Sequence, residues 1–93
     1  MGCSIEITFS LLEDFLMFIM GDFGDMEVHQ DTLSVDCYGN HRLLTDVHSW
    51  CECVSEGKVT TLETFDGYDT TTVYQEGVML SQESVEEENP VPS

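Results

Sequence analysis

Positive charge is scarce in this 93-residue chain. Arg42 and Lys58 are its only Lys or Arg residues, against 19 Asp and Glu, so the formal net charge is −17. A protein that binds nucleic acid directly neutralises phosphates with clustered Lys and Arg. Adsorption to an anionic membrane surface depends on the same residue types. The lack of basic side chains therefore argues against direct binding to nucleic acid and against binding to an anionic membrane.

Long hydrophobic runs are absent too. The longest, residues 15–20, has six residues, whereas a helix needs about 20 to cross a bilayer. The first ten residues contain no Lys or Arg and are interrupted by Glu6, so no secretory signal is predicted. We therefore expect a cytoplasmic protein that does not enter a membrane and whose four cysteines stay reduced.

The N-terminal part of the chain predicts a strand followed by a helix. Apolar and polar residues alternate over residues 5–9, which is typical of a strand with one buried face. Residues 10–20 then have apolar side chains at helical spacing. Ser10 and Glu13 fit a capping box at the start of this helix, and Gly21 fits a cap at its end.

The remaining pattern is mostly that of strands, which we expect at residues 33–38, 43–54, 59–65, 70–75 and 78–80. The segment 43–54 fits a helix as well, and a strand is favoured because Glu56 and Gly57 follow as a possible hairpin turn. Asp66-Gly67 is the strongest hairpin signal in the chain, and Glu76-Gly77 is a second one.

These elements predict one α+β domain over residues 1–82. Its architecture is one N-terminal helix packed on an antiparallel, meander-like sheet. Hydrophobic residues make up 41% of the chain, which is too many for a wholly disordered acidic protein. Residues 83–93 contain four glutamates and two prolines, so we expect them to form a disordered acidic tail.

Cysteine and histidine residues cluster in the middle of the chain, within 17 residues, at Cys37, His41, His48, Cys51 and Cys53. Zinc favours these ligand types, but the spacing lacks paired C-x2–4-C units. Buried structural cysteines are therefore the favoured interpretation, and no cofactor is expected. A Cys51–His48 nucleophile pair has no framing glycines, and no catalytic motif is present, so we do not expect an enzyme.

Acidic residues are distributed over the whole chain. Without the residues from Glu83 onward, 15 acids and 2 bases remain, so the predicted body has a charge near 2 − 15 = −13. A small domain needs a net charge of only about 2–8 in magnitude to stay soluble. The excess charge predicts that the protein binds a basic partner and that the association rate falls as the salt concentration rises.

Basic clefts large enough to match such an acidic surface belong mostly to nucleic-acid-binding proteins. In size and composition the whole chain resembles the small acidic inhibitors that phages use against host defence, which include DNA mimics and anti-CRISPR proteins. That resemblance implies a phage protein that binds a nuclease or CRISPR effector in the host cytoplasm. Two alternatives are an immunity protein that neutralises a basic toxin nuclease and a small zinc-clipped acidic adaptor.

The predicted partner-binding residues are acids of the domain body, with two tyrosines beside turns that could act as anchors inside a charged rim. They are Glu13, Asp14, Asp22, Asp25, Glu27, Asp31, Asp36, Tyr38, Asp66, Tyr68 and Asp69.

Overall fold

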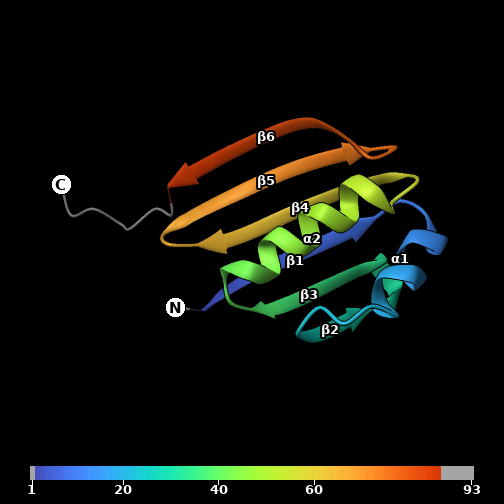
Figure 1. Ribbon diagram of the computed structural model, residues 1–93, viewed down its shortest axis with the longest axis horizontal. Coiled ribbons are helices and arrows are strands. Elements are labelled where there is room, and N and C mark those ends of the chain that lie inside the picture. The colour runs from blue at the N-terminus through green and yellow to red at the C-terminus, as the bar shows by residue number, and fades with distance from the viewer. Residues whose placement is uncertain (1, 87–93) are drawn as a thin grey trace.

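The computed structural model describes residues 2–86, which form one six-stranded sheet and two α-helices (Figure 1). The strands pair antiparallel throughout, in the order β2-β3-β1-β4-β5-β6. In chain order the elements are β1 (Cys3–Phe9), α1 (Leu12–Ile19), β2 (Asp25–His29), a 3-10 turn η1 (Gln30–Thr32), β3 (Ser34–Gly39), α2 (His41–Cys53), β4 (Lys58–Phe65), β5 (Tyr68–Gln75) and β6 (Val78–Glu86).

Both helices lie on one face of the sheet (Figure 1). Alternate residues of the central strand β1 are buried, because every second side chain of a strand points to the same face. Phe9, on the buried face of β1, contacts Phe18 of α1 and Trp50 of α2 with ring centroids 5.5 and 5.8 Å apart. Within residues 2–86 no helix covers the opposite side of the sheet, which we call the open face.

The α+β class and the antiparallel sheet are confirmed, as are the first strand and the first helix. The two predicted tight turns are also present. Asp66 and Gly67 have φ of 54° and 80°, and Glu76 and Gly77 have 52° and 79°. Positive φ at both central residues is the conformation that joins two antiparallel strands with the correct twist.

The prediction of a single helix is wrong, because residues 41–53 form a helix where a strand over 43–54 was expected. Helix α2 begins after Asn40, whose side chain accepts a hydrogen bond from the backbone N–H of Arg42 at 3.0 Å. Its buried residues are Leu43, Leu44, Val47 and Cys51, which lie on one side of a helix. Glu56 and Gly57 therefore connect a helix to β4 and do not form a hairpin turn.

The sheet is a meander only from β4 to β6, because β1 lies between β3 and β4. Strand β6 runs to Glu86 and crosses the predicted domain boundary at residue 82, so the first four residues of the predicted tail belong to the sheet. The rest of that tail, 87–93, lies outside the described residues. Neither helix in the described part of the chain is long and apolar enough to span a membrane.

The predicted capping box of α1 is wrong, because the helix is preceded by Leu11, which makes no side-chain cap. At the other end Gly21 follows the C-cap residue Met20, and its backbone N–H donates to the Phe18 carbonyl at 3.0 Å. The Ser10 hydroxyl instead accepts the backbone N–H of Lys58 at 2.9 Å. The hydroxyl thus joins the end of β1 to the start of β4.

Candidate functional site

The open face carries a row of side chains that crosses all six strands. Residues directly opposite each other in an antiparallel sheet point to the same face, so the strand register identifies this row. In strand order it contains Glu27, Asp36, Glu6, Leu62, Thr71 and Glu83. Its first three members, Glu27, Asp36 and Glu6, are carboxylates on adjacent strands, and we call them the carboxylate row.

The carboxylate row places like charges side by side. Neighbouring strands lie about 4.7–4.9 Å apart, so each carboxylate has another as its direct cross-strand neighbour. Like charges in that position destabilise a sheet. Asp25 adds a further acid to the same face, opposite the half-exposed Tyr38. The fold therefore tolerates a local concentration of negative charge on a surface that its own helices do not cover.

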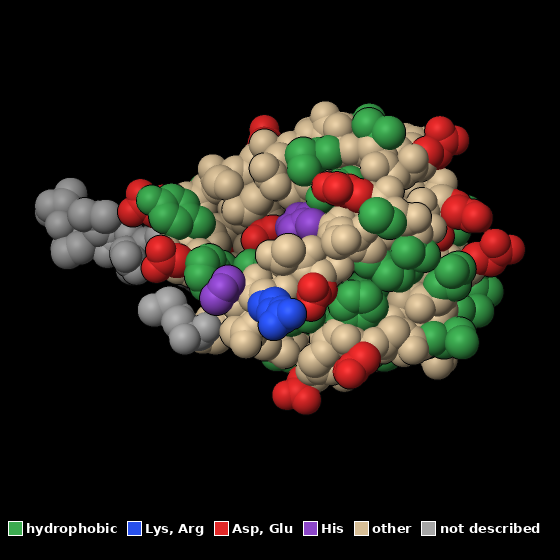
Figure 2. Space-filling model, viewed as in Figure 1, with side chains coloured by type: hydrophobic (Ala, Val, Ile, Leu, Met, Phe, Trp, Pro, Cys, Tyr) green, Lys and Arg blue, Asp and Glu red, His purple; other side chains and the backbone are tan. Residues whose placement is uncertain are grey.

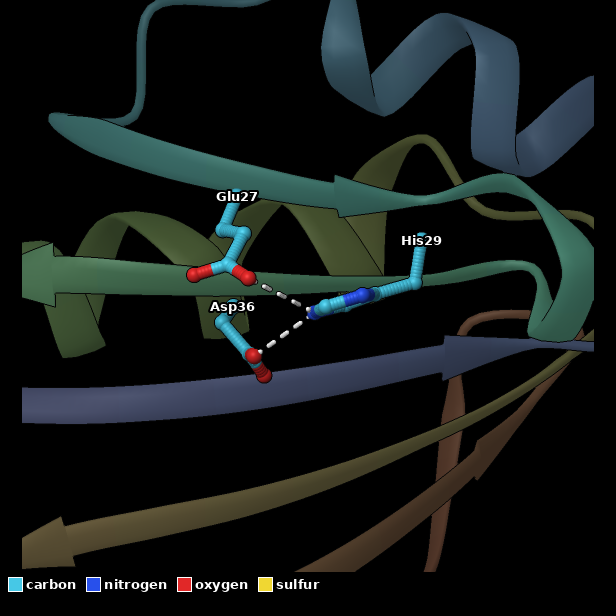
Figure 3. A group of neighbouring side chains, drawn as sticks. All are labelled: Glu27, His29 and Asp36. Carbon is cyan, nitrogen blue, oxygen red and sulfur yellow. Dashed lines mark hydrogen bonds and ion pairs between the residues drawn. The ribbon is translucent and has the colours of Figure 1, made fainter.

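His29 lies beside the carboxylate row and contacts two of its members (Figure 3). Its Nε2–H donates a hydrogen bond to Asp36 Oδ2 at 2.9 Å, and Glu27 Oε1 lies 3.8 Å from the same nitrogen. The Asp36 hydrogen bond is the main cause that raises the pKa of His29 above 6.5, and the charges of Asp36, Glu27 and Glu6 raise it further. His29 therefore offsets part of the repulsion within the row when it is protonated.

Five of the predicted partner-binding residues share the open face: Asp25, Glu27, Asp36, Tyr38 and Asp69. The others that stay exposed lie elsewhere. Glu13 is on α1, Asp22 is in the α1–β2 connection, Asp31 is in η1, and Asp66 and Tyr68 are at the β4–β5 turn.

Asp14 is a correction to the prediction. It is 1% exposed, and its carboxylate accepts hydrogen bonds from the backbone N–H groups of Glu56 and Gly57. Asp14 thus connects α1 to the segment before β4 and has no surface to offer a partner.

Two residues of this site, Glu6 and His29, were not predicted. The alternation in β1 placed Glu6 on the exposed face of a strand, but only the pairing of β1 with β3 places it opposite Asp36. His29 reaches Asp36 in the same way, through the β2–β3 register. The local sequence pattern gives the face of each strand, whereas the position of Glu6 and His29 next to Asp36 depends on how the strands pair.

A second polar group lies on the helix side, in a hollow between α2 and the outer strands. Figure 2 shows this hollow, with a histidine and an acidic side chain in it. It has a volume of about 650 Å³, and its lining includes His48, Glu63 and Gln82. His48 Nε2–H donates to Glu63 Oε1 at 2.6 Å, and the Tyr74 hydroxyl lies 2.7 Å from His48 Nδ1. Both ring nitrogens are thereby occupied, and the group connects α2 to β4 and β5.

The cysteines and histidines of the zinc alternative do not come together. No three of them bring their ligand atoms within 4.8 Å of one another, although all five lie within the described range. Cys37 and Cys51 are core residues with no exposed surface, and burial raises the pKa of each thiol to about 12. The thiolate is the nucleophilic and metal-binding form, so both cysteines are inert packing residues at neutral pH.

Tyr74 provides a test of the helix-side group. Burial raises the pKa of its hydroxyl to about 12, with smaller contributions from Cys51, Glu52 and Glu63. Between pH 10 and 12 the folded chain then holds a proton that the unfolded chain has lost, so stability should fall as the pH rises through this window. Absorbance of tyrosinate near 295 nm should show a last step at about pH 12 that Tyr74→Phe removes.

Tyr68→Phe is the matched control for that titration, because Tyr68 is exposed and outside the hollow. It should leave the last step in place. Tyr74→Phe also leaves His48 Nδ1 without its partner, at a cost of about 1–2 kcal/mol of stability. A last step that persists in Tyr74→Phe would contradict the assignment of the raised pKa to the buried Tyr74 hydroxyl.

The helix-side and open-face polar groups differ in how many polar atoms they leave free to bind a ligand or partner. The helix-side group uses its hydrogen-bonding atoms internally. The open-face group has three carboxylates to one histidine, and two of those carboxylates, Glu6 and Glu27, are exposed. Comparison with protein-family models, curated proteins and solved structures gives no match for this chain. The open face is therefore the candidate site on the geometry of its own side chains.

Proposed function

We propose that this chain is a small acidic inhibitor whose open face binds the basic nucleic-acid-binding surface of another protein and excludes DNA or RNA from it. The observation that supports this proposal is the carboxylate row on a sheet face that no described helix covers. Three like charges in adjacent positions destabilise the sheet by themselves. A basic partner would reverse that effect by supplying the missing positive charges.

The spacing of the carboxylates suits this role. Adjacent strands present one charge per about 4.8 Å across the row. Each strand of duplex DNA presents one phosphate per about 3.4 Å of axis, which is a similar linear density. A sheet also holds its carboxylates on a rigid frame, so binding avoids much of the ordering cost that a flexible polyanion would incur. Tyr38, 46% exposed beside the row, is suited to be an aromatic anchor.

The open face is favoured over the helix side as the binding surface, because within residues 2–86 no Lys or Arg lies next to the carboxylate row. Among the described residues, Lys58 is the one Lys or Arg on the open face, and it lies four residues along β4 from Leu62 of the row. On the helix side, acids are spread around the rim with a basic side chain among them (Figure 2). The carboxylate row thus places three acids side by side on adjacent strands, with Lys58 away from them.

The experiment compares two triple variants of equal net charge. The open-face variant carries Glu6→Gln, Glu27→Gln and Asp36→Asn, and the helix-side control carries Glu13→Gln, Glu52→Gln and Glu56→Gln, which are exposed residues. Each tagged protein is used to capture partners from a bacterial lysate that contains nucleases and CRISPR effector complexes. The captures run with a chelator present, at low and high salt, with and without competing duplex DNA or RNA.

The wild type and the helix-side control should capture the same nucleic-acid-binding protein, and DNA, RNA or high salt should release it. The open-face variant should lose at least about tenfold in affinity, since one close interfacial charge pair contributes about 1.5 kcal/mol or more. Equal losses in both variants, or capture that neither salt nor nucleic acid affects, would contradict the proposal. Capture of one toxin nuclease alone would assign the chain to the immunity proteins instead.

A further inference from the structure

Three potential metal ligands converge on the open face. Glu27 and His29 are two residues apart on β2, and Asp36 lies opposite Glu27 on β3 (Figure 3). His29 Nε2 lies 2.9 Å from Asp36 Oδ2 and 3.8 Å from Glu27 Oε1. All three ligand atoms lie within 4.8 Å of one another, and in residues 2–86 no other set of three His, Cys, Asp or Glu side chains does so.

The distances between these atoms match those between neighbouring ligands of one metal ion. Zinc binds imidazole nitrogen and carboxylate oxygen at about 2.0–2.2 Å. Two ligand atoms at that distance are then about 3.0 Å apart at a right angle and about 3.4 Å apart at a tetrahedral angle. The observed 2.9 and 3.8 Å fall on either side of these values. Small side-chain rotations are enough to place an ion between the three atoms.

The sheet holds the three ligands without help from a loop. Residues two apart on a strand point to the same face, and residues opposite each other on neighbouring strands have their Cβ atoms about 4.5–5.5 Å apart. The backbone of β2 and β3 therefore sets the ligand positions before an ion binds. A dication would also neutralise charge next to Glu6, the third member of the carboxylate row.

The ligand chemistry selects the class of ion. One imidazole with two carboxylates suits divalent zinc, manganese, cobalt or nickel, whereas calcium and magnesium prefer oxygen ligands alone. The side chains of His29 and Glu27 are 38% and 63% exposed, so an ion bound here would keep positions open on the solvent side. Water, or a side chain of a bound protein, would fill those positions.

From this geometry we propose that Glu27, His29 and Asp36 form a binding site for one divalent transition-metal ion, with Zn²⁺ as the ion to test. The site does not depend on the proposed inhibitor function, because it needs no partner protein. It differs from the zinc alternative considered for the sequence, with which it shares no residue.

The test is a titration of the chelator-treated, full-length protein with Zn²⁺, followed by calorimetry and by Co²⁺ visible absorption. We expect one ion per chain. His29→Gln and Asp36→Asn should each weaken Zn²⁺ binding at least about tenfold, the lower limit seen even for residues that only support a metal ligand. His41→Gln, an exposed histidine on α2, and Glu83→Gln, an acid of the same cross-strand row, should leave binding unchanged.

A direct measurement on the wild type removes any dependence on how the variants fold. In nitrogen-15 spectra of the imidazole side chains, Zn²⁺ should shift the His29 Nε2 resonance and leave that of His41 in place. The proposal is overturned by the absence of stoichiometric Zn²⁺ binding, by a His29→Gln variant that binds like the wild type, or by Ca²⁺ that competes equally with Zn²⁺. The last result would mean general attraction to the acidic face.

Discussion

Replacing Asp14 with alanine should lower the free energy of unfolding by about 3 kcal/mol, because it leaves two backbone N–H groups without their charged acceptor. The Asp14 carboxylate accepts the Gly57 N–H at 2.8 Å and the Glu56 N–H at 3.0 Å, from a position that is 1% exposed. A domain of this length has about 5–14 kcal/mol of stability in total. The loss would therefore consume a large share of it.

Urea unfolding of Asp14→Ala, Asp14→Asn and Glu13→Ala would measure this effect. Asp14→Asn keeps one side-chain oxygen as an acceptor and should have a smaller effect than alanine. Glu13→Ala removes an exposed carboxylate from the same helical turn and should change stability by less than about 0.5 kcal/mol. Equal effects of Asp14→Ala and Glu13→Ala would contradict an anchoring role for Asp14.

Asp14 also shows a limit of reasoning from residue type. Asp14 and Glu13 are adjacent acids in the first turn of the same predicted helix, so the sequence predicted both as partner-binding residues. Only the three-dimensional packing of α1 on the segment before β4 distinguishes the buried acid from the exposed one. The sequence separation of 42 residues in this hydrogen bond explains why no local pattern indicates it.

The second helix was missed for a different reason. Its signals are local: Asn40 is an N-cap, and Leu43, Leu44 and Val47 repeat at helical spacing. The same segment also alternates around Trp50, and Glu56-Gly57 resembles a hairpin turn. The preference for a strand relied on that turn and did not treat Asn40 as a helix N-cap, whose side chain accepts the Arg42 N–H at 3.0 Å.

The hairpins were predicted well because a tight turn is determined by two adjacent residues. Asp66-Gly67 and Glu76-Gly77 fix the pairing of β4, β5 and β6 from within the chain. The candidate site depends instead on β1 pairing with β3, from which it is separated by a helix and another strand. Composition indicated an acidic surface, but the alignment of Glu27, Asp36 and Glu6 arises from that non-local register.

Phe18→Ala should be the most destabilising single substitution considered for this chain, with a loss of about 3–5 kcal/mol. Phe18 has no exposed surface. Its ring is stacked on Phe23 at 4.4 Å, meets Trp50 edge-on at 5.1 Å, and lies 5.5 Å from Phe9. Alanine would leave a cavity between α1, α2 and β1 that these rigid rings cannot fill by small movements.

Thermal unfolding of Phe18→Ala and Met17→Ala would measure the difference, at about 4–8 °C per kcal/mol for a domain of this size. Met17 is the neighbouring residue on α1 and is 49% exposed, so its substitution should have little effect. A small effect of Phe18→Ala would mean that α1 does not pack on the sheet through this aromatic cluster. Phe18 lies on the helix side of the sheet, so Phe18→Ala should leave the affinities of the proposed Zn²⁺ and partner sites on the open face unchanged in the folded molecules. Only the amount of folded protein should fall.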